Sequence, residues 1–137
     1  MATAAALLFS WRDTYSVGIA QIDNQHKQMI SLINKLHSTL LQGNGTNARA
    51  EIMDELVRYT DSHFAYEESL LHQRDYSGLS AHSQEHKRLA AQVRNMRDNL
   101  HSGKLAASLA LMEFLEDWLC GHILDRDMAY AREFKGR

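Results

Sequence analysis

The sequence predicts an all-α protein, an antiparallel up-down-up-down four-helix bundle with an ordered N-terminal arm. The 137 residues include no proline, the residue that most often breaks a helix. Four segments of about twenty residues carry apolar side chains at three- and four-residue steps, which is the period of an amphipathic helix. Loops of roughly three to seven residues join these segments, and such short loops place consecutive helices side by side in opposite directions.

Length and composition are those of one globular domain, with 45% apolar and 23% charged residues. We expect a single domain over residues 1–137, with the arm over 1–20 and the helical bundle with a short C-terminal tail over 21–134. A net charge of −2 and the absence of Lys/Arg clusters argue against nucleic acid as a partner. The apolar run at residues 4–9 is too short to span a membrane and follows no basic residue, so we expect a soluble, cytoplasmic protein.

The arm, residues 1–20, shows no sustained helical period, yet it is too apolar for a solvated tail. Its bulky side chains are Phe9, Trp11, Tyr15, Val17 and Ile19. We therefore expect it to pack across the helices. Asp23 suits a helix N-cap, and the apolar steps after it predict a first helix over residues 23–41. Two glycines and several turn-prone residues in 42–47 end that helix.

The second and third helices each carry one continuous inner stripe. The second runs from that loop to about residue 72, with the stripe Ile52, Leu56, Tyr59, His63, Tyr66 and Leu70. Glu67 lies one turn beyond His63. Residues 75–78 form a turn, and the third helix follows with the stripe His82, His86, Leu89, Val93, Met96 and Leu100.

The fourth helix begins after a loop that includes residues 101–104 and has a distinctive end. Its inner residues are Leu111, Leu115, Trp118 and His122, with Met112 and Leu119 adjoining. Asp127 lies just past the expected end. Asp127 is the fifth residue after His122, roughly 140° around an ideal helix, so the helix must end or distort if both reach one site.

Histidines on all four helices should lie at one end of the bundle. In the first hairpin, His26 and His63 stand 18 residues from the loop at 44–45, one before it and one after it. Around the third loop, His86 and His122 stand 17 and 19 residues from its glycine. Because each helical residue adds about 1.5 Å of rise, each pair lies at the same height.

The combination of inward histidines on all four helices favours metal binding. A single histidine on an apolar face is usually a core residue that hydrogen-bonds to a carbonyl group. Here two ligand pairs at four-residue spacing, His63/Glu67 and His82/His86, lie on different helices, and single inward histidines lie on the other two. Burying several imidazoles without partners is costly, and a bound metal would supply the partner.

The remaining histidines and the only cysteine fit structural roles. His72 is about half a turn out of phase with His63 and should face solvent. His101 ends a helix, where a partly cationic imidazole is favoured. His37 lies about three turns below His26, so we interpret it as structural or partly exposed. Cys120 has no partner for a disulfide or a CxxC pair, and the best interpretation is a small buried residue.

The candidate ligands are five imidazoles and two carboxylates: His26, His63, Glu67, His82, His86, His122 and Asp127. This set is too large for one zinc ion. Two octahedral ions that share both carboxylates and one solvent-derived bridge would leave one position vacant for an exogenous ligand. Imidazole with carboxylate suits iron, zinc or manganese, so the ligand types leave the metal open.

These motifs resemble the hemerythrin family, particularly its single-domain bacterial members. The resemblance lies in the order HxxxE at 63–67, HxxxH at 82–86 and HxxxxD at 122–127, preceded by an isolated histidine in Ile22-Asp23-Asn24-Gln25-His26-Lys27. It extends over nearly the whole chain, from Trp11 to the segment Trp118-Leu119-Cys120-Gly121-His122-Ile123.

The resemblance implies a non-haem di-iron site. In it, one iron would be bound by His82, His86 and His122, and the other by His26 and His63. Glu67 and Asp127 would bridge the two ions together with an oxo or hydroxo group. Dioxygen would bind at the vacancy on the two-histidine iron. Trp118, Leu119 and Ile123 stand where the family has its apolar oxygen pocket, positions that are equally compatible with ordinary core.

Reversible dioxygen binding, for transport or storage, is the function that this resemblance implies. The alternatives are a di-iron redox enzyme that handles peroxide or nitric oxide, and an oxygen or redox sensor. Oxygen-activating di-iron enzymes typically use Glu-x-x-His pairs, and the sequence contains none. We therefore favour a protein that is not an enzyme. Its partners would be dioxygen and an oxygen-consuming enzyme or a reductase, and the outward faces show no apolar seam that would define an oligomer.

Overall fold

The computed structural model describes residues 9–42, 46–102 and 109–136, and most of these are helical with no strand among them. A 3₁₀ turn, η1 (Asp13–Tyr15), precedes the helices α2 (Ala20–Gln42), α3 (Thr46–Gln73), α4 (Leu79–His101) and α5 (Leu109–His122). The π-helical turn η2 (Ile123–Asp127) then leads into α6 (Met128–Lys135). The all-α fold class is confirmed.

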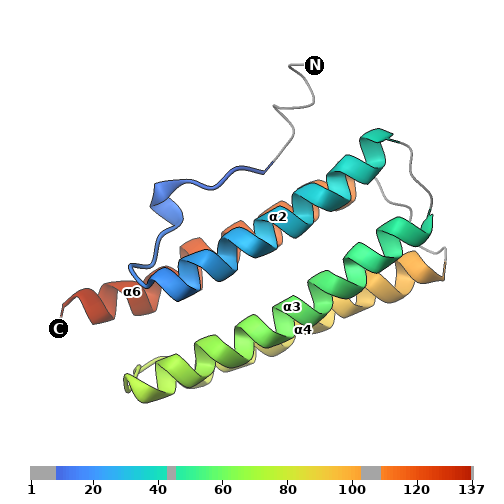
Figure 1. Cartoon of the computed structure of the whole chain (residues 1–137). Helices are drawn as coiled ribbons and strands as arrows, with labels where there is room; N and C mark the ends of the chain where they lie inside the picture. Colours follow the sequence, from blue (N-terminus) through green and yellow to red (C-terminus); the bar gives the residue numbers. More distant parts are fainter. Residues whose placement is uncertain (1–8, 43–45, 103–108, 137) are drawn as a thin grey trace.

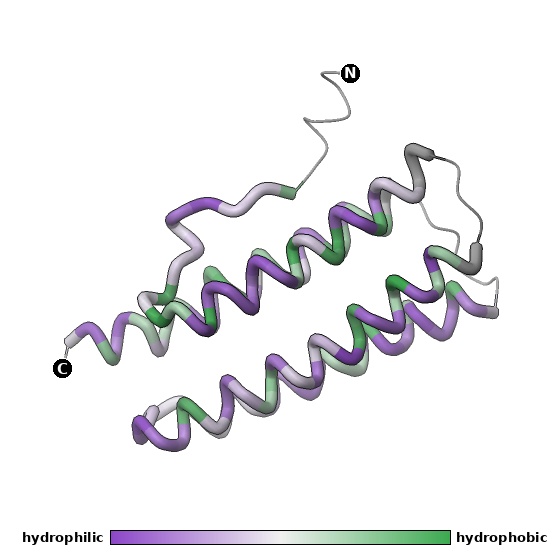
Figure 2. The backbone as a smooth tube through the Cα atoms, viewed as in Figure 1, coloured by the Kyte–Doolittle hydropathy of each residue, from purple (hydrophilic) through white to green (hydrophobic). Residues whose placement is uncertain are grey.

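The helices form the expected up-down-up-down bundle. The helix α3 lies against both α2 and α4, and α5 returns against α2. Figure 1 shows α2 with α5 behind it and α3 with α4 behind it, while α6 continues beyond α5 toward the C-terminus. Figure 2 shows hydrophobic and hydrophilic residues alternating around each helix, as amphipathic packing requires.

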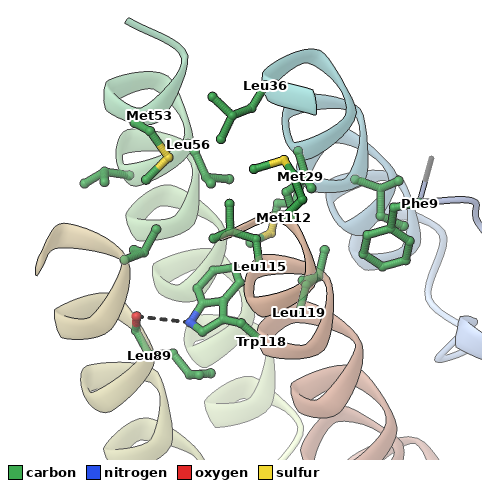
Figure 3. Close-up of a cluster of buried hydrophobic side chains, with 14 of the residues drawn as sticks. Phe9, Met29, Leu36, Met53, Leu56, Leu89, Met112, Leu115, Trp118 and Leu119 are labelled. Carbon is green, nitrogen blue, oxygen red and sulfur yellow. Dashed lines mark hydrogen bonds between the residues drawn. The ribbon is translucent and has the colours of Figure 1, made fainter. Parts of the chain in front are cut away.

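The main core fills the space between α2, α3, α4 and α5. Part of it is drawn in Figure 3, including Met29, Leu36, Met53, Leu56, Met112 and Leu115. Full burial of an aliphatic or methionine side chain contributes about 1.5–3 kcal/mol relative to exposure. Within the described residues, no helix is both long enough and apolar enough to cross a membrane.

One polar link crosses this core between α4 and α5. The indole Nε1 of Trp118 donates a 3.3 Å hydrogen bond to the backbone oxygen of Leu89, drawn as a dashed line in Figure 3. The bond satisfies a buried donor, which would otherwise cost free energy. It also fixes the orientation of the indole ring between α4 and α5.

The described part of the arm, residues 9–19, is ordered and packed as expected. Both backbone polar groups of Phe9 bond to the side chain of Asn34, at 2.9 Å and 2.7 Å. Phe9 and Tyr15 meet edge to face with ring centroids 6.2 Å apart, and both are buried. The first eight residues lie outside the described part.

The predicted N-cap role of Asp23 is wrong, because α2 already begins at Ala20. Asp23 instead lies in the first turn, where a carboxylate interacts favourably with the helix dipole. Its oxygens accept hydrogen bonds from the Ser16 hydroxyl at 2.6 Å and the Val17 backbone N–H at 2.9 Å. The residue therefore ties the end of the arm to the start of the bundle.

The predicted inner stripe of α3 is partly wrong. Tyr66 is 39% exposed, whereas Thr60 and Phe64 are buried. The helix packs against two neighbours, α2 and α4, so its buried face is wider than one stripe and is rotated away from Tyr66. Apolar periodicity located the buried face only approximately.

Candidate metal centre

All seven predicted ligands converge at one point inside the bundle, and none is more than 5% exposed. The helix α2 supplies one of them, α3 two, α4 two, α5 one and the end of η2 one: His26, His63, Glu67, His82, His86, His122 and Asp127. Their potential ligand atoms form two overlapping groups, each within 4.8 Å, of three and five residues.

The π-helical turn η2 brings Asp127 into this group. The backbone N–H of Met128 donates to the carbonyl oxygen of Ile123, five residues back, as in a π-helix. The wider turn places Asp127 Oδ1 3.0 Å from His122 Nε2. The sequence placed Asp127 just past the end of the fourth helix, before a short tail. Instead the helix distorts there and continues as α6.

The two oxygens of Glu67 face different histidines. Oε1 lies 2.7 Å from Nε2 of His82 and 2.9 Å from Nε2 of His86. Oε2 faces the other side, 3.6 Å from Nε2 of His63 and 3.9 Å from Nε2 of His26. One carboxylate therefore spans a pair of histidines from α4 and a pair from α2 and α3.

Asp127 spans the same two groups. Its Oδ1 lies 3.1 Å from Nε2 of His82 and 3.0 Å from Nε2 of His122, and its Oδ2 lies 3.0 Å from Nε2 of His26. The five histidines are thus divided into a group of three and a group of two. A carboxylate with one oxygen toward each group is the arrangement of a ligand that bridges two ions.

Buried polar atoms without partners test whether these residues fit metal ions. Several ligand nitrogens and oxygens have no hydrogen-bond partner among the described residues: Nε2 of His26, His63, His86 and His122, and both oxygens of Asp127. Leaving such groups unpaired is expensive, and coordination would satisfy them. The imidazole and carboxylate donors fit a non-haem di-iron centre.

Two side chains outside the ligand set orient ligand histidines. Gln25 Oε1 accepts a 2.6 Å hydrogen bond from Nδ1 of His63, and Glu68 Oε2 accepts a 2.8 Å hydrogen bond from Nδ1 of His86. With the proton on Nδ1, the Nε2 lone pair points into the site. Sequence reasoning missed both residues, although each is the chain neighbour of a predicted ligand.

A third missed residue contacts the carboxylate from α6. The hydroxyl of Tyr130 donates a 3.0 Å hydrogen bond to Oε2 of Glu67, and the tyrosine is fully buried. Burial and the nearby Glu67 and Asp127 charges raise the pKa of this phenol far above its usual range. Tyr130 therefore stays a neutral donor, a role that nothing in the predicted C-terminal tail indicated.

Charge complementarity makes the metal-free site an ion-pair network. Burial and the Asp127 charge push the pKa of Glu67 upward, but the close contacts with the His82 and His86 imidazoles prevail and lower it to about 2. Burial lowers the pKa of His82, while its close contacts with the Asp127 and Glu67 carboxylates prevail and raise it to about 9. Burial brings the pKa of His63 down to about 4. Ionised carboxylates thus coexist with imidazoles of unequal basicity.

A small apolar pocket lies against the site and contacts both histidine groups. Its lining consists of His63, Phe64, Leu89, Trp118, Leu119 and His122. Trp118 and Leu119, two of the three residues predicted for an oxygen pocket, are part of this lining, and the binding of oxygen there stays a prediction. Ile123 is fully buried in the core but is not part of this lining.

The other histidines lie away from the centre. His72 is exposed, as predicted. His101 ends α4, also as predicted, and lies 3.3 Å from a carboxylate oxygen of Asp54. His37 is only 3% exposed, so the structural interpretation holds and the partly exposed one does not.

Comparisons with known proteins agree with this geometry. The family described as "Hemerythrin HHE cation binding domain" matches residues 17–133. Among curated proteins, a bacteriohemerythrin of Pseudomonas aeruginosa (strain LESB58) is 38% identical over 121 residues, covering 88% of this chain and 78% of that protein. A bacteriohemerythrin of Stenotrophomonas maltophilia (strain R551-3) is 37% identical and covers 93% and 82% of the two chains.

A solved structure supports the same relationship. The crystal structure of wild-type hemerythrin superposes with a TM-score of 0.83 at 28% identity, covering 91% of this chain and 96% of that one. The family match spans most of the sequence, and it includes all seven converging residues. This chain belongs to the hemerythrin family.

Proposed function

We propose that this protein binds dioxygen reversibly at a non-haem di-iron centre and serves in oxygen transport or storage. The observation that carries the proposal is the apolar pocket, because its lining includes His63 from one histidine group and His122 from the other. A diatomic, uncharged ligand suits such a pocket better than a polar substrate does.

Seven residues would hold the irons. His82, His86 and His122 would hold one ion and His26 with His63 the other, with the two carboxylates shared between the ions. Ferrous iron bound there supplies the electrons that reversible dioxygen binding needs. Four carboxylate oxygens and five imidazoles, from α2, α3, α4, α5 and η2, would hold the ions, and this would keep the site rigid.

The pocket favours binding over catalysis. Phe64, Leu89 and Leu119 exclude water from the site, and the indole N–H of Trp118 is already bonded to the backbone of Leu89. The pocket lining therefore offers no carboxylic acid or hydroxyl group that could deliver a proton to bound oxygen. This is the physical basis for proposing that the protein is not an oxidase or peroxidase.

The test combines metal analysis with visible spectroscopy. The protein is loaded with ferrous iron, reduced without oxygen, exposed to air and then returned to argon. We expect about two irons per chain, one per histidine group, and a charge-transfer band that appears in air and disappears under argon over repeated cycles. Irreversible bleaching with hydrogen peroxide turnover would support the enzyme alternative, and binding of zinc without iron would contradict both.

The physiological setting is a further part of the proposal. The cytoplasmic location and a partner that consumes oxygen or reduces the iron centre both stay predictions. An oxygen or redox sensor would use the same site, and it would show an oxygen-dependent change in binding to a partner rather than simple reversible loading.

A further inference from the structure

The two histidine groups differ in what lies behind them. In the two-histidine group, Nδ1 of His63 donates to the neutral amide oxygen of Gln25 at 2.6 Å. In the three-histidine group, Nδ1 of His86 donates to a carboxylate oxygen of Glu68 at 2.8 Å. Both Nε2 atoms point into the site, so Gln25 and Glu68 would each influence a different metal ion through the histidine that they contact.

The Glu68 contact is held in place by a second hydrogen bond. The hydroxyl of Ser83 donates to Oε1 of Glu68 at 2.7 Å, which leaves Oε2 for His86. Since Glu68 and Ser83 lie on α3 and α4, the bonds join the two helices beside the centre. The carboxylate is only 32% exposed, so water screens its charge incompletely.

The two acceptors differ in strength. A hydrogen bond from an imidazole N–H to a carboxylate is charge-assisted and roughly twice as strong as one to a neutral amide. It draws the proton away from the ring, so the opposite nitrogen becomes a better electron donor to a metal. The amide oxygen of Gln25 fixes the ring of His63 equally well but adds little electron density.

We propose that Glu68 and Gln25 are positioning residues that make the two metal sites electronically unequal. Glu68 strengthens donation at the three-histidine site, which then holds its ion more tightly and favours the ferric state. Gln25 keeps the two-histidine site, next to the apolar pocket, a weaker donor with a more loosely held ion. The inference rests on the proposed di-iron centre, but it does not depend on dioxygen binding.

Matched charge changes separate this role from a general electrostatic effect. The test variants are Glu68→Gln, which weakens the carboxylate contact, and Gln25→Glu, which creates one behind His63. The controls are Glu55→Gln on α3 and Gln28→Glu on α2, which make the same charge changes at exposed positions. Thermal melts of the metal-free proteins confirm that every variant folds.

The first readout is the midpoint potential of the iron-loaded protein, measured by spectroelectrochemistry without oxygen. Glu68→Gln should raise the potential and Gln25→Glu should lower it, each by more than its exposed control. A structural role alone would not shift the potential in opposite directions. Equal shifts in each variant and its control would overturn the proposal.

The second readout is the loss of iron, or of cobalt(II) as a probe, to an excess of chelator. In Glu68→Gln the more tightly held ion should leave about tenfold faster, because loss of such an outer partner typically costs 10–100-fold in affinity. In Gln25→Glu the faster-leaving ion should be retained longer. Unchanged release rates would contradict the inference even if air and argon cycles showed reversible oxygen binding. Failure of those cycles with the expected release rates would contradict the proposed function alone.

Discussion

The hydroxyl of Tyr130 lies 3.0 Å from Oε2 of Glu67, and both side chains are completely buried. The tyrosine comes from α6, beyond the π-helical turn, and the glutamate from the C-terminal part of α3. A residue near the C-terminus therefore helps to hold a carboxylate that faces both histidine groups.

Replacement of this tyrosine should loosen the carboxylate. In Tyr130→Phe, Oε2 of Glu67 loses a donor, and a hydrogen bond to a charged group is worth about 1.5–3 kcal/mol. We expect the free energy of unfolding of the metal-free protein to fall by about that amount in denaturant titrations. Tyr66→Phe, at an exposed position, is the control. Equal stability of the two variants would show that the buried hydroxyl contributes nothing.

The pocket assignment of Leu119 predicts faster autoxidation when its side chain is shortened. Leu119→Ala opens space beside His63 and His122, and water that enters there can protonate or displace bound oxygen. The variant should lose about 2–5 kcal/mol of stability and oxidise several-fold faster. Decay of the oxygenated spectrum measures the rate. Leu124→Ala, where the side chain is 43% exposed, should decay like the wild type, and an unchanged rate in Leu119→Ala would argue against the assignment.

The metal-free protein should lose stability at alkaline pH. His82 has a folded-state pKa of about 9, above its ordinary value of 6.5, because its imidazole lies between the Asp127 and Glu67 carboxylates. Its proton therefore stabilises the fold fully below pH 6.5, and this stabilisation disappears as the pH rises through about 9.

Denaturant unfolding between pH 6 and 10 measures this loss. His82→Gln should flatten the slope, whereas His72→Gln, at an exposed position, should leave it unchanged. Bound metal should also flatten it, because coordinated imidazoles carry no extra proton. A metal-free wild type with constant stability across this range would contradict the prediction.

Loss of Asp23 should release the arm. In Asp23→Ala, the hydroxyl of Ser16 and the backbone N–H of Val17 lose their acceptor, and the cost should be about 1–3 kcal/mol. Limited proteolysis should then cut the arm at lower protease concentrations. Asp13→Ala, at an exposed position in η1, is the control. If both variants resist protease equally, Asp23 does not hold the arm.

Helix number, helix order and the convergence of the seven predicted ligands follow from patterns that the sequence carries locally. Apolar periodicity defines each helix, and equal distances from a loop predict equal heights, as for His26 and His63. Such reasoning is strong where a residue's role depends on its own helix. Periodicity was a weaker guide for α3. This helix packs against both α2 and α4, and Tyr66, which was predicted to face inward, is exposed.

The outer hydrogen-bond partners could not be predicted in the same way. Gln25 and Glu68 are polar residues next to ligands, and polar residues at such positions commonly face solvent. Their contacts depend on the rotation of one helix against another, which periodicity does not determine. Tyr130 was missed for a different reason, since we placed Asp127 just past the end of the fourth helix and interpreted the residues after it as a short tail.

The π-helical turn η2 determines which side chains of α6 face the bundle. A π turn carries one residue more than an α turn, so every side chain after η2 is rotated by about 100° relative to an unbroken α5. The rotation that aims Asp127 at three histidines therefore also turns Tyr130 inward toward Glu67. Removal of a single residue between His122 and Asp127 would keep all seven ligand residues but rotate the whole of α6. The contact of Tyr130 with Glu67 and the contact of Asp127 with His122 would then be lost together.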